Sequence, residues 1–223
     1  MPGNALLVVN GEIVTRAYAV IDNFLSPQEH LDLWAAFQET AFSHHDVGAW
    51  NRSYQLTDGE NLVSSAFQPR KPSLRDGTAG GSPAQPLLRA LCEKLSALMT
   101  VSQPPIAIDP WTGFSVSAWT YRPGMGLEWH SDTGWLGAYI YYVHPVWRAS
   151  WGGELLVATD DDSSAGIEAA CGTGHALIYP QPNRLVLLRG GTRHCIKKVE
   201  SAAGQAYRAS VSGFFFNAGN ASD

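Results

Sequence analysis

The sequence predicts a mainly β fold, a sandwich or jelly roll with helices packed on one sheet. Eight short strand-like segments follow one another after residue 106, separated by Gly- and Pro-rich turns. Two helix-like segments with apolar stripes precede them. The chain has 223 residues, 45% of them hydrophobic and 16% charged, which is typical of a compact domain with a substantial core. We therefore expect residues 1–223 to form a single domain.

The composition indicates which class of binding partner and which cellular compartment to expect. The formal net charge is −5, whereas a nucleic-acid-binding surface needs a basic patch, so the charge argues against nucleic acid as a partner. Three cysteines without paired spacing indicate a reducing compartment. The sequence has neither the pattern of a signal peptide nor an apolar run long enough to span a membrane. We therefore expect a cytoplasmic protein.

The N-terminal part is expected to form a hairpin followed by a helix. Residues 5–9 and 12–21 have strand character and flank Asn10-Gly11, a strong hairpin signal. Ser26-Pro27-Gln28-Glu29 is a capping box with Pro at the first helical position. The core-facing stripe of this helix is expected to consist of Leu31, Trp34, Ala35 and Phe37.

Residues 42–82 are polar, rich in Gly and Ser, and longer than an ordinary connection. Such a segment is either a lid or substrate loop, or an unstructured insertion. A second helix is expected from Ser82-Pro83 to Pro104-Pro105, with an apolar stripe of Leu87, Leu88, Leu91, Leu95 and Leu98. The strands that follow are expected over residues 113–121, 127–132, 137–143, 153–158, 175–179, 184–188, 194–199 and 206–216.

Three His-x-acid triplets occur in the chain: His30/Asp32, His44/Asp46 and His130/Asp132. The first lies in the predicted helix, where residues two apart do not face each other, and the second has no strand pattern around it. Only His130 and Asp132 lie on a predicted strand, whose alternation puts both side chains on one face. With a second histidine they would form a two-His, one-carboxylate triad that leaves coordination positions open.

His194 and His175 both begin predicted strands, and pattern alone leaves the choice of the second histidine open. His194 follows the Gly190-Gly191 turn, and antiparallel pairing would bring this turn across the sandwich to face the His130 strand. Further along, Arg208 and Ser210 share one face of an apolar strand. A buried guanidinium needs a partner, and with the hydroxyl it could clamp a small carboxylate. The alternative is an arginine whose head reaches solvent.

These residues, taken in order, resemble the Fe(II)/2-oxoglutarate-dependent dioxygenases, in particular their prolyl-4-hydroxylase-like branch. The resemblance extends over VIDNFLSPQEHLDLW (20–34), Tyr121 and Gly124 before the triplet, GGEL (152–155) and PQPNRLVLLRGGTRH (180–194). It favours His194 over His175. It implies a double-stranded β-helix (jelly roll) that couples oxidative decarboxylation of 2-oxoglutarate to oxidation of a C–H bond.

The resemblance also implies a site. Fe(II) would be held by His130, Asp132 and His194, and would use O2. The cosubstrate 2-oxoglutarate would chelate the iron and place its far carboxylate on Arg208 and Ser210. Further cosubstrate contacts would come from Tyr121 and from one of Tyr139 and Tyr141. A small residue replaces the carboxylate in the family's halogenases, so Asp132 points to hydroxylation or a related oxidation such as desaturation.

The substrate class remains open between two readings. Aromatic and basic residues suggest an enclosed pocket, and therefore a small molecule such as an amino acid or a biosynthetic intermediate: Trp50, Arg52, Trp135, His144 and Arg148. The branch resemblance suggests instead a prolyl residue in a peptide or protein. Nucleic-acid demethylases of this superfamily carry a second Arg where this chain has Phe214, which again argues against nucleic acid. A catalytically silent jelly-roll binding module is a third reading, against which the intact triad and Arg208 speak.

Overall fold

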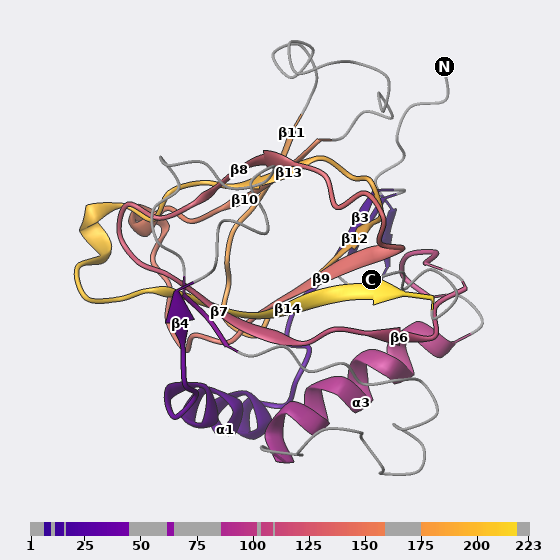
Figure 1. Ribbon diagram of the computed structural model, residues 1–223, viewed down its shortest axis with the longest axis horizontal. Coiled ribbons are helices and arrows are strands. Elements are labelled where there is room, and N and C mark those ends of the chain that lie inside the picture. Colours follow the sequence, from indigo (N-terminus) through magenta and orange to yellow (C-terminus); the bar gives the residue numbers. More distant parts are fainter. Residues whose placement is uncertain are drawn as a thin grey trace.

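The computed structural model describes residues 7–9, 12–15, 17–44, 62–64, 86–101, 104–108, 110–158 and 175–217. In this part of the chain, two β-sheets lie one above the other, and two helices cover the outer side of the larger sheet (Figure 1). This arrangement confirms the predicted mainly β jelly roll with helices packed on one sheet.

The larger sheet contains the N-terminal strands and the long C-terminal strand. Its order is β1 (Leu7–Val9), β2 (Glu12–Val14), β3 (Tyr18–Ile21), β12 (Leu185–Arg189), β9 (Gly137–Tyr142), β14 (Arg208–Phe216), β7 (Ser117–Tyr121), β5 (Leu62–Val63) and β4 (Ser43–His44), while β6 (Gly113–Phe114) pairs with β14. The smaller sheet has the order β11 (His175–Ile178), β10 (Leu155–Ala158), β13 (His194–Ile196) and β8 (Leu127–His130). The pairings between these strands are antiparallel.

The predicted strands are present, with two of them divided. Residues 113–121 form both β6 and β7, and residues 12–21 form β2 and β3, which pair with each other. The second division has a local cause, because the hydroxyl of Thr15 accepts a hydrogen bond from the backbone N–H of Tyr18 (3.0 Å). Such side-chain bonding to a neighbouring N–H is typical of turns and interrupts a strand.

Alternation along β14 separates the core from the interior of the sandwich. Ala209, Val211 and Phe215 pack into the core beneath the helices, together with Leu33 of one helix and Leu95 of the other. The intervening residues of β14 therefore face the smaller sheet. This strand thus divides an apolar layer from the layer in which the site lies.

Helix α1 (Pro27–Gln38) has the predicted capping box. The Ser26 hydroxyl accepts from the Glu29 N–H (3.3 Å), and the Glu29 carboxylate accepts from the Ser26 N–H (2.8 Å). The predicted stripe is wrong in part, because Leu31 is 52% exposed and Ala35 is also exposed. The buried face is instead shifted by one position and consists of His30, Leu33, Ala36 and Phe37.

A buried hydrogen bond explains this shift. The His30 ring lies 2.6 Å from the hydroxyl of Tyr141, which lets a polar residue occupy the core face of α1.

Helix α3 (Pro86–Thr100) agrees better with its predicted apolar stripe, because Leu91 and Leu95 are fully buried as predicted. Its predicted start at Ser82-Pro83 lies outside the described residues.

Two short strands lie within the segment predicted as a lid or substrate loop, residues 42–82. Strands β4 and β5 pair with each other, and β5 continues the larger sheet beside β7. Residues 45–61 and 65–82 of the segment, including Trp50 and Arg52, lie outside the described residues.

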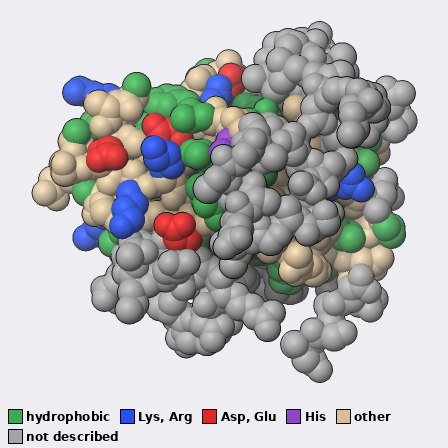
Figure 2. Space-filling model, turned by 90° about the horizontal axis from the view of Figure 1, so that it is seen from above, with side chains coloured by type: hydrophobic (Ala, Val, Ile, Leu, Met, Phe, Trp, Pro, Cys, Tyr) green, Lys and Arg blue, Asp and Glu red, His purple; other side chains and the backbone are tan. Residues whose placement is uncertain are grey.

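The surface over the smaller sheet carries charges of both signs. Figure 2 looks onto this face, where Lys and Arg side chains are interspersed with Asp and Glu in the coloured part. Among the described helices, none has the length and apolar character needed to cross a membrane.

Candidate functional site

His130, Asp132 and His194 come together at one edge of the smaller sheet. His130 is the last residue of β8, and His194 is the first residue of β13, which pairs with β8 so that the two histidines are direct neighbours. The two imidazole rings lie 4.2 Å apart between centroids. His194 therefore stands beside His130 in the same sheet, rather than across the sandwich as the pairing argument predicted. Asp132 follows just after β8 has ended.

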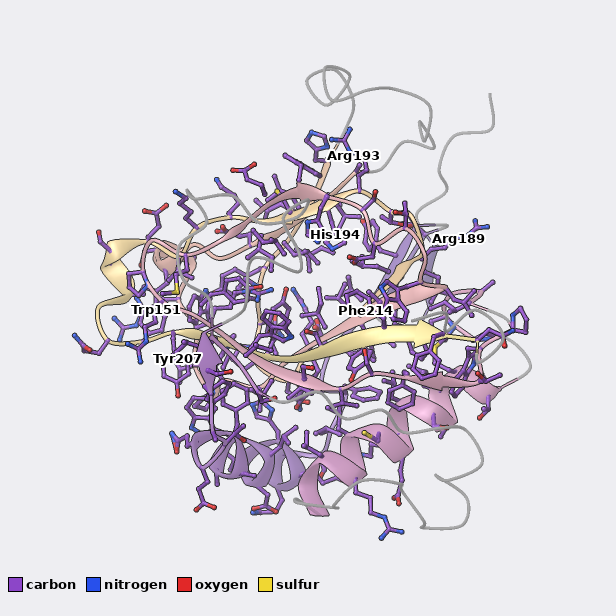
Figure 3. The ribbon with its side chains drawn as sticks, in the orientation of Figure 1. Trp151, Arg189, Arg193, His194, Tyr207 and Phe214 are labelled. Carbon is purple, nitrogen blue, oxygen red and sulfur yellow. The ribbon has the colours of Figure 1, made fainter. Side chains whose placement is uncertain are left out.

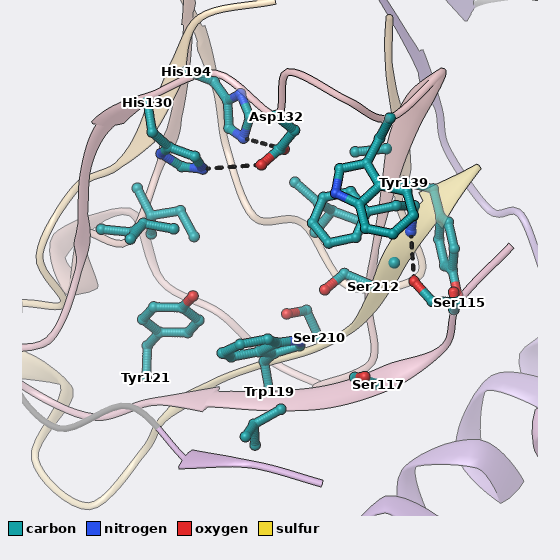
Figure 4. A pocket seen from close by; sticks show the side chains of 18 of the residues that line it. Ser115, Ser117, Trp119, Tyr121, His130, Asp132, Tyr139, His194, Ser210 and Ser212 are labelled. Atoms are coloured by element: carbon teal, nitrogen blue, oxygen red, sulfur yellow. Dashed lines mark hydrogen bonds and ion pairs between the residues drawn. The ribbon is translucent and has the colours of Figure 1, made fainter. Parts of the chain in front are cut away.

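The three side chains form a compact ligand set. One possible ligand atom from each lies within 4.8 Å of the others, and among the described residues no other group of His, Cys, Asp and Glu does so. The Asp132 carboxylate lies 3.9 Å from Nε2 of His130 and 3.5 Å from Nε2 of His194 (Figure 4). The side chains are 7–13% exposed. This is the donor set of a two-His, one-carboxylate metal site.

Backbone contacts orient both imidazoles. Nδ1 of His130 lies 2.7 Å from the carbonyl oxygen of Glu128, and Nδ1 of His194 lies 2.9 Å from that of Thr192. A carbonyl only accepts, so Nδ1 carries the hydrogen in each ring and Nε2 keeps its lone pair. Both lone pairs are thereby available on the side of Asp132, as in metal sites whose histidines are fixed by a second hydrogen bond.

Burial disfavours the charged forms of His194 and Asp132. It lowers the pKa of His194 to about 3, an effect that the neighbouring His130 reinforces. Burial also raises the pKa of Asp132, although His130 acts in the opposite direction. A bound divalent cation would favour the neutral imidazoles and the ionised carboxylate, and would therefore offset the desolvation of Asp132.

Arg208 is the first residue of β14 and is fully buried. Its Nε donates to the carbonyl of Gly153 (3.0 Å) and its Nη2 to the hydroxyl of Tyr142 (3.3 Å). The guanidinium lies over the rings of Tyr121 and Tyr142, at 5.2 and 4.9 Å. Its Nη1 has no hydrogen-bond partner among the described residues. Burying the Arg208 guanidinium with one donor unpaired costs free energy unless an anion accepts from that donor. The surroundings of Arg208 are therefore suited to an anionic ligand.

One cavity of about 350 Å³ joins the triad to Arg208. It lies between the two sheets, and His194 and Phe214 reach it from opposite sides, whereas Arg193 points away (Figure 3). Most of the side chains of the larger sheet that line it come from β7, β9 and β14, and they include three serines and several aromatic residues: Ser117, Trp119, Tyr121, Ala138, Ile140, Arg208, Ser210, Ser212 and Phe214.

Several predicted residues line this cavity. Tyr121 and Ser210 lie at its Arg208 end, and Trp135 stacks on Phe214 with ring centroids 5.1 Å apart. Tyr139 also borders the cavity, but its hydroxyl donates to the carbonyl of Ser115 (3.0 Å) and its ring packs in the core below. Its hydroxyl is therefore committed to the fold.

Three predicted pocket residues do not line the cavity, and their placement there was wrong. Tyr141 belongs to the opposite face of β9, where its hydroxyl donates to Asn183 (3.0 Å). The ring of His144 is buried between the carbonyl of Pro180 (2.8 Å) and the backbone of Ala209 (3.2 Å). Arg148 is exposed and lies over the ring of Trp151, at 5.4 Å. Each side chain satisfies its needs outside the pocket. Trp50 and Arg52 lie outside the described residues.

Sequence reasoning missed Tyr142, the contact of Gly153 with Arg208, and the cavity serines Ser117 and Ser212. Tyr142 stands opposite Ser210 in the β9–β14 register, so it lies on the face of β9 that is turned towards the smaller sheet, where its hydroxyl accepts from Arg208. The pairing of β9 with β14 would have identified it. The GGEL motif did mark Gly153, but the contact of its carbonyl with Arg208 joins residues 55 positions apart.

Comparisons with known proteins agree with this geometry. Residues 116–216, which contain the triad and Arg208, match the family model of the 2OG-Fe(II) oxygenase superfamily. A search of curated proteins found no match. A prolyl hydroxylase from Trichoplax adhaerens, in complex with a hypoxia inducible factor oxygen degradation domain peptide fragment, has a similar structure (TM-score 0.68, 18% identity, 93% of this chain and 88% of that one).

Two further solved structures share the fold. A Pseudomonas putida prolyl-4-hydroxylase has a TM-score of 0.61 at 16% identity, with 90% of this chain and 92% of that one covered. The non-heme alpha ketoglutarate dependent epimerase SnoN from nogalamycin biosynthesis has a TM-score of 0.52 at 12% identity, with 91% and 80% covered. At these identities the likeness concerns the fold.

The chain thus matches the 2OG-Fe(II) oxygenase superfamily over residues 116–216, and its structural neighbours include a prolyl-4-hydroxylase and a prolyl hydroxylase. It is an oxygenase that depends on Fe(II), 2-oxoglutarate and O2.

Proposed function

We propose that this oxygenase hydroxylates a small-molecule substrate, with His130, Asp132 and His194 as the ligands of Fe(II). The observation that supports this best is the shared cavity. Two Nε2 atoms and a carboxylate line it on the side of the smaller sheet, and a buried guanidinium whose Nη1 has no partner among the described residues lines it on the side of the larger sheet. Iron bound by three protein ligands keeps coordination positions open for 2-oxoglutarate and O2. Together, iron, 2-oxoglutarate and O2 would supply the oxidation of a C–H bond.

Arg208, Ser210 and Tyr121 would hold the far carboxylate of 2-oxoglutarate. Nη1 of Arg208 supplies a charge-assisted donor. Ser210, two residues further along β14, places its hydroxyl on the same face of the strand. The Gly153 carbonyl and the Tyr142 hydroxyl fix the guanidinium from the other side. Leu127 and Ile196, beside the triad, exclude water from this part of the cavity.

The walls of the cavity favour a small substrate. Trp119, Trp135 and Phe214 give its far end aromatic sides, and concave aromatic pockets of this size are typical of small-molecule sites. We also propose that residues 42–82 are a substrate loop, because Val63 and Ser64 from this segment line the cavity. A prolyl residue of a peptide is the second candidate, since the Trichoplax adhaerens neighbour is a prolyl hydroxylase in complex with a peptide fragment.

The cosubstrate site is tested by anaerobic addition of Fe(II) and 2-oxoglutarate. We expect a weak visible charge-transfer band, followed by succinate formation when O2 is admitted with a substrate. Screening small molecules and proline-containing peptides for stimulated succinate release distinguishes the two substrate classes. Absence of the band and of succinate with every compound would contradict the proposed function.

Two substitutions test the assignment of residues. Asp132→Ala should abolish hydroxylation, since it removes one of the three ligands. Arg208→Ala should raise the KM for 2-oxoglutarate by about tenfold to a hundredfold, because it removes a charged hydrogen bond from a buried site. Arg148→Ala is the matched control, because this arginine is exposed and outside the cavity. Full activity in Asp132→Ala, or an unchanged KM in Arg208→Ala, would show that the site is misplaced.

A further inference from the structure

We call the wall of the cavity that the larger sheet forms its floor. In this floor β14 pairs with β7 on one side and with β9 on the other, and the register places side chains that face the cavity directly opposite one another on neighbouring strands. Arg208 stands opposite Tyr121, and two residues along, Ser210 stands opposite Trp119. Two residues further, Ser212 stands opposite Ser117. The floor therefore runs from a charged end at Arg208 to a second end around the Ser117–Ser212 pair.

The second end lies beyond the reach of the cosubstrate. Ser212 is four positions from Arg208 along an extended strand, so their Cα atoms are roughly 13 Å apart. A 2-oxoglutarate molecule that spans from Arg208 to the triad cannot also cover Ser212. In Figure 4, Tyr121 lies below His130, whereas Ser212 and Ser117 lie on the other side of Trp119.

The hydroxyls of Ser117 and Ser212 are not used by the described part of the fold. Two other cavity serines are: the Ser115 hydroxyl accepts from the Phe214 N–H (2.9 Å) and that of Ser64 from the Ala118 N–H (2.9 Å). No hydrogen bond of the described residues engages the side chain of Ser117 or Ser212, although both line the cavity. Opposed residues on antiparallel strands have Cβ atoms about 5 Å apart, so both hydroxyls can contact one ligand group.

The same end offers no charge. Among the described residues, neither Lys nor Glu lines the cavity. The charged or metal-binding residues of the lining are the triad and Arg208. The surroundings of Ser117 and Ser212 are instead apolar and aromatic: Trp119, Ile140, and Trp135 stacked on Phe214. An ionised group placed here would lose its hydration without gaining a counter-charge, whereas a neutral hydrogen-bonding group would be matched by two hydroxyls.

We propose that the Ser117–Ser212 end of the cavity binds an uncharged amide or hydroxyl group of the substrate, with an attached ring held between Trp119 and the Trp135–Phe214 stack. This inference rests on the proposed function, because it takes the Arg208 end to be filled by 2-oxoglutarate. It narrows the substrate to a neutral, ring-bearing group and excludes a free zwitterionic amino acid at this position. An amide-linked ring can come from a small molecule or from a peptide.

The test measures binding by ligand-observed NMR to the full chain, loaded with Zn(II) in place of Fe(II) and saturated with 2-oxoglutarate. The probes are two series in which one ring carries different charges. The first is phenylacetamide, phenylacetate and phenethylamine, and the second is N-acetylprolinamide, N-acetylproline and prolinamide. A blocked decapeptide that contains a prolyl residue forms a separate arm.

We expect the uncharged member of at least one series to bind about tenfold tighter than its charged partners, because only it avoids an unpaired charge. Ser117→Ala and Ser212→Ala should each weaken this binding by about threefold to tenfold and leave 2-oxoglutarate binding unchanged. Ser201→Ala, an exposed serine outside the cavity, is the control. Tighter binding of the decapeptide than of N-acetylprolinamide would support the same chemistry with a peptide as its source.

Three results would overturn the inference: a charged member that binds as tightly as its amide, amide binding that survives both serine substitutions, or no binding by any uncharged probe while 2-oxoglutarate still binds. Thermal melting establishes that each variant is folded, and Ser117→Ala, at a half-buried position, stands in if Ser212→Ala does not fold. Failure of 2-oxoglutarate itself to bind the metal-loaded wild type would instead contradict the proposed function, and this inference with it.

Discussion

At the scale of single residues, the environment of Arg208 shows how a glycine can position a buried arginine. Gly153 has φ +73°, and a Cβ at this position would lie 3.1 Å from Cδ of Arg208. Its carbonyl accepts the Nε–H of the same arginine. The glycine therefore allows the arginine stem to pass closely and fixes the direction of its guanidinium.

Gly153→Ala should raise the KM for 2-oxoglutarate by about threefold to tenfold, because the added methyl displaces the Arg208 stem. The positive φ should also cost about 1–3 kcal/mol of stability. Gly204→Ala provides the matched control, since Gly204 has φ +61° with nothing within 4 Å of its Cβ position. It should lose stability and keep its KM. Equal KM values in the two variants, measured by 2-oxoglutarate titration, would contradict this account of Gly153.

A second residue-scale prediction concerns His144. Burial, with a contribution from the nearby Arg208, lowers its pKa to about 4 from 6.5. The unfolded state therefore binds more protons between these values, and stability rises with pH across this window. As the pH falls from about 6.5 to about 4, this histidine alone should remove up to roughly 3 kcal/mol of the free energy of unfolding.

The measurement is denaturant unfolding at several pH values. His144→Gln should show a shallower loss of stability on acidification than the wild type, because it removes one of the buried groups that must take up a proton. His30 and His194, whose pKa values are also lowered by burial, keep part of the slope. An unchanged slope in His144→Gln would show that its burial is not the cause.

At the scale of elements, the site is formed by the pairing of β13 with β8 and by the alternation of β14. The first brings two histidines side by side, and the second points Arg208, Ser210 and Ser212 into one cavity. Helix α1 contributes to the opposite layer, where it packs under the larger sheet. Its cap should therefore affect stability without affecting the chemistry.

Ser26→Ala should lower the free energy of unfolding by about 1 kcal/mol, since it removes the acceptor for the Glu29 N–H. The KM for 2-oxoglutarate should not change. Ser150→Ala, at an exposed position that caps no α-helix, should have little effect on either quantity. Urea unfolding and a cosubstrate titration together check this prediction, and a raised KM in Ser26→Ala would show that α1 is coupled to the site.

At the scale of the whole molecule, the two sheets face each other across the cavity, and each side contributes a group to the proposed binding sites. The buried carboxylate of Asp132 and the free Nη1 of Arg208 lie on opposite sheets. A metal ion and 2-oxoglutarate would satisfy both and connect the layers. Binding should therefore stabilise the whole domain rather than a local segment.

Mn(II) and 2-oxoglutarate, each at about 100 times its dissociation constant, should each add about 2.7 kcal/mol, or about 5 kcal/mol together, and raise the Tm by roughly 10–20 °C. Asp132→Ala should lose most of this increase. Asp32→Ala, on the surface of α1, should retain it. Differential scanning calorimetry with and without ligands measures the shift, and an increase of the same size in Asp132→Ala would speak against a metal ligand at this position.

The sequence by itself determined the features that local pattern encodes. Strand alternation and turn residues predicted the jelly roll, the capping box predicted α1, and the family resemblance carried by His130, Asp132, His194 and Arg208 implied the oxygenase class. These features depend on neighbours along the chain or on motifs whose chemistry demands particular side chains. Local pattern contains no information about partners that are distant in the sequence. It therefore predicted the wrong buried stripe on α1, where the distant Tyr141 pairs with His30.

Only the tertiary structure decided which face of each strand meets the cavity. Tyr141 and Tyr142 are adjacent, yet one bonds to Asn183 beneath the sheet and the other to Arg208 within the sandwich. His144 is held by backbone groups of Pro180 and Ala209, far along the chain. The register of β14 between β7 and β9 sets these choices, because shifting a strand by one residue reverses the direction of every side chain.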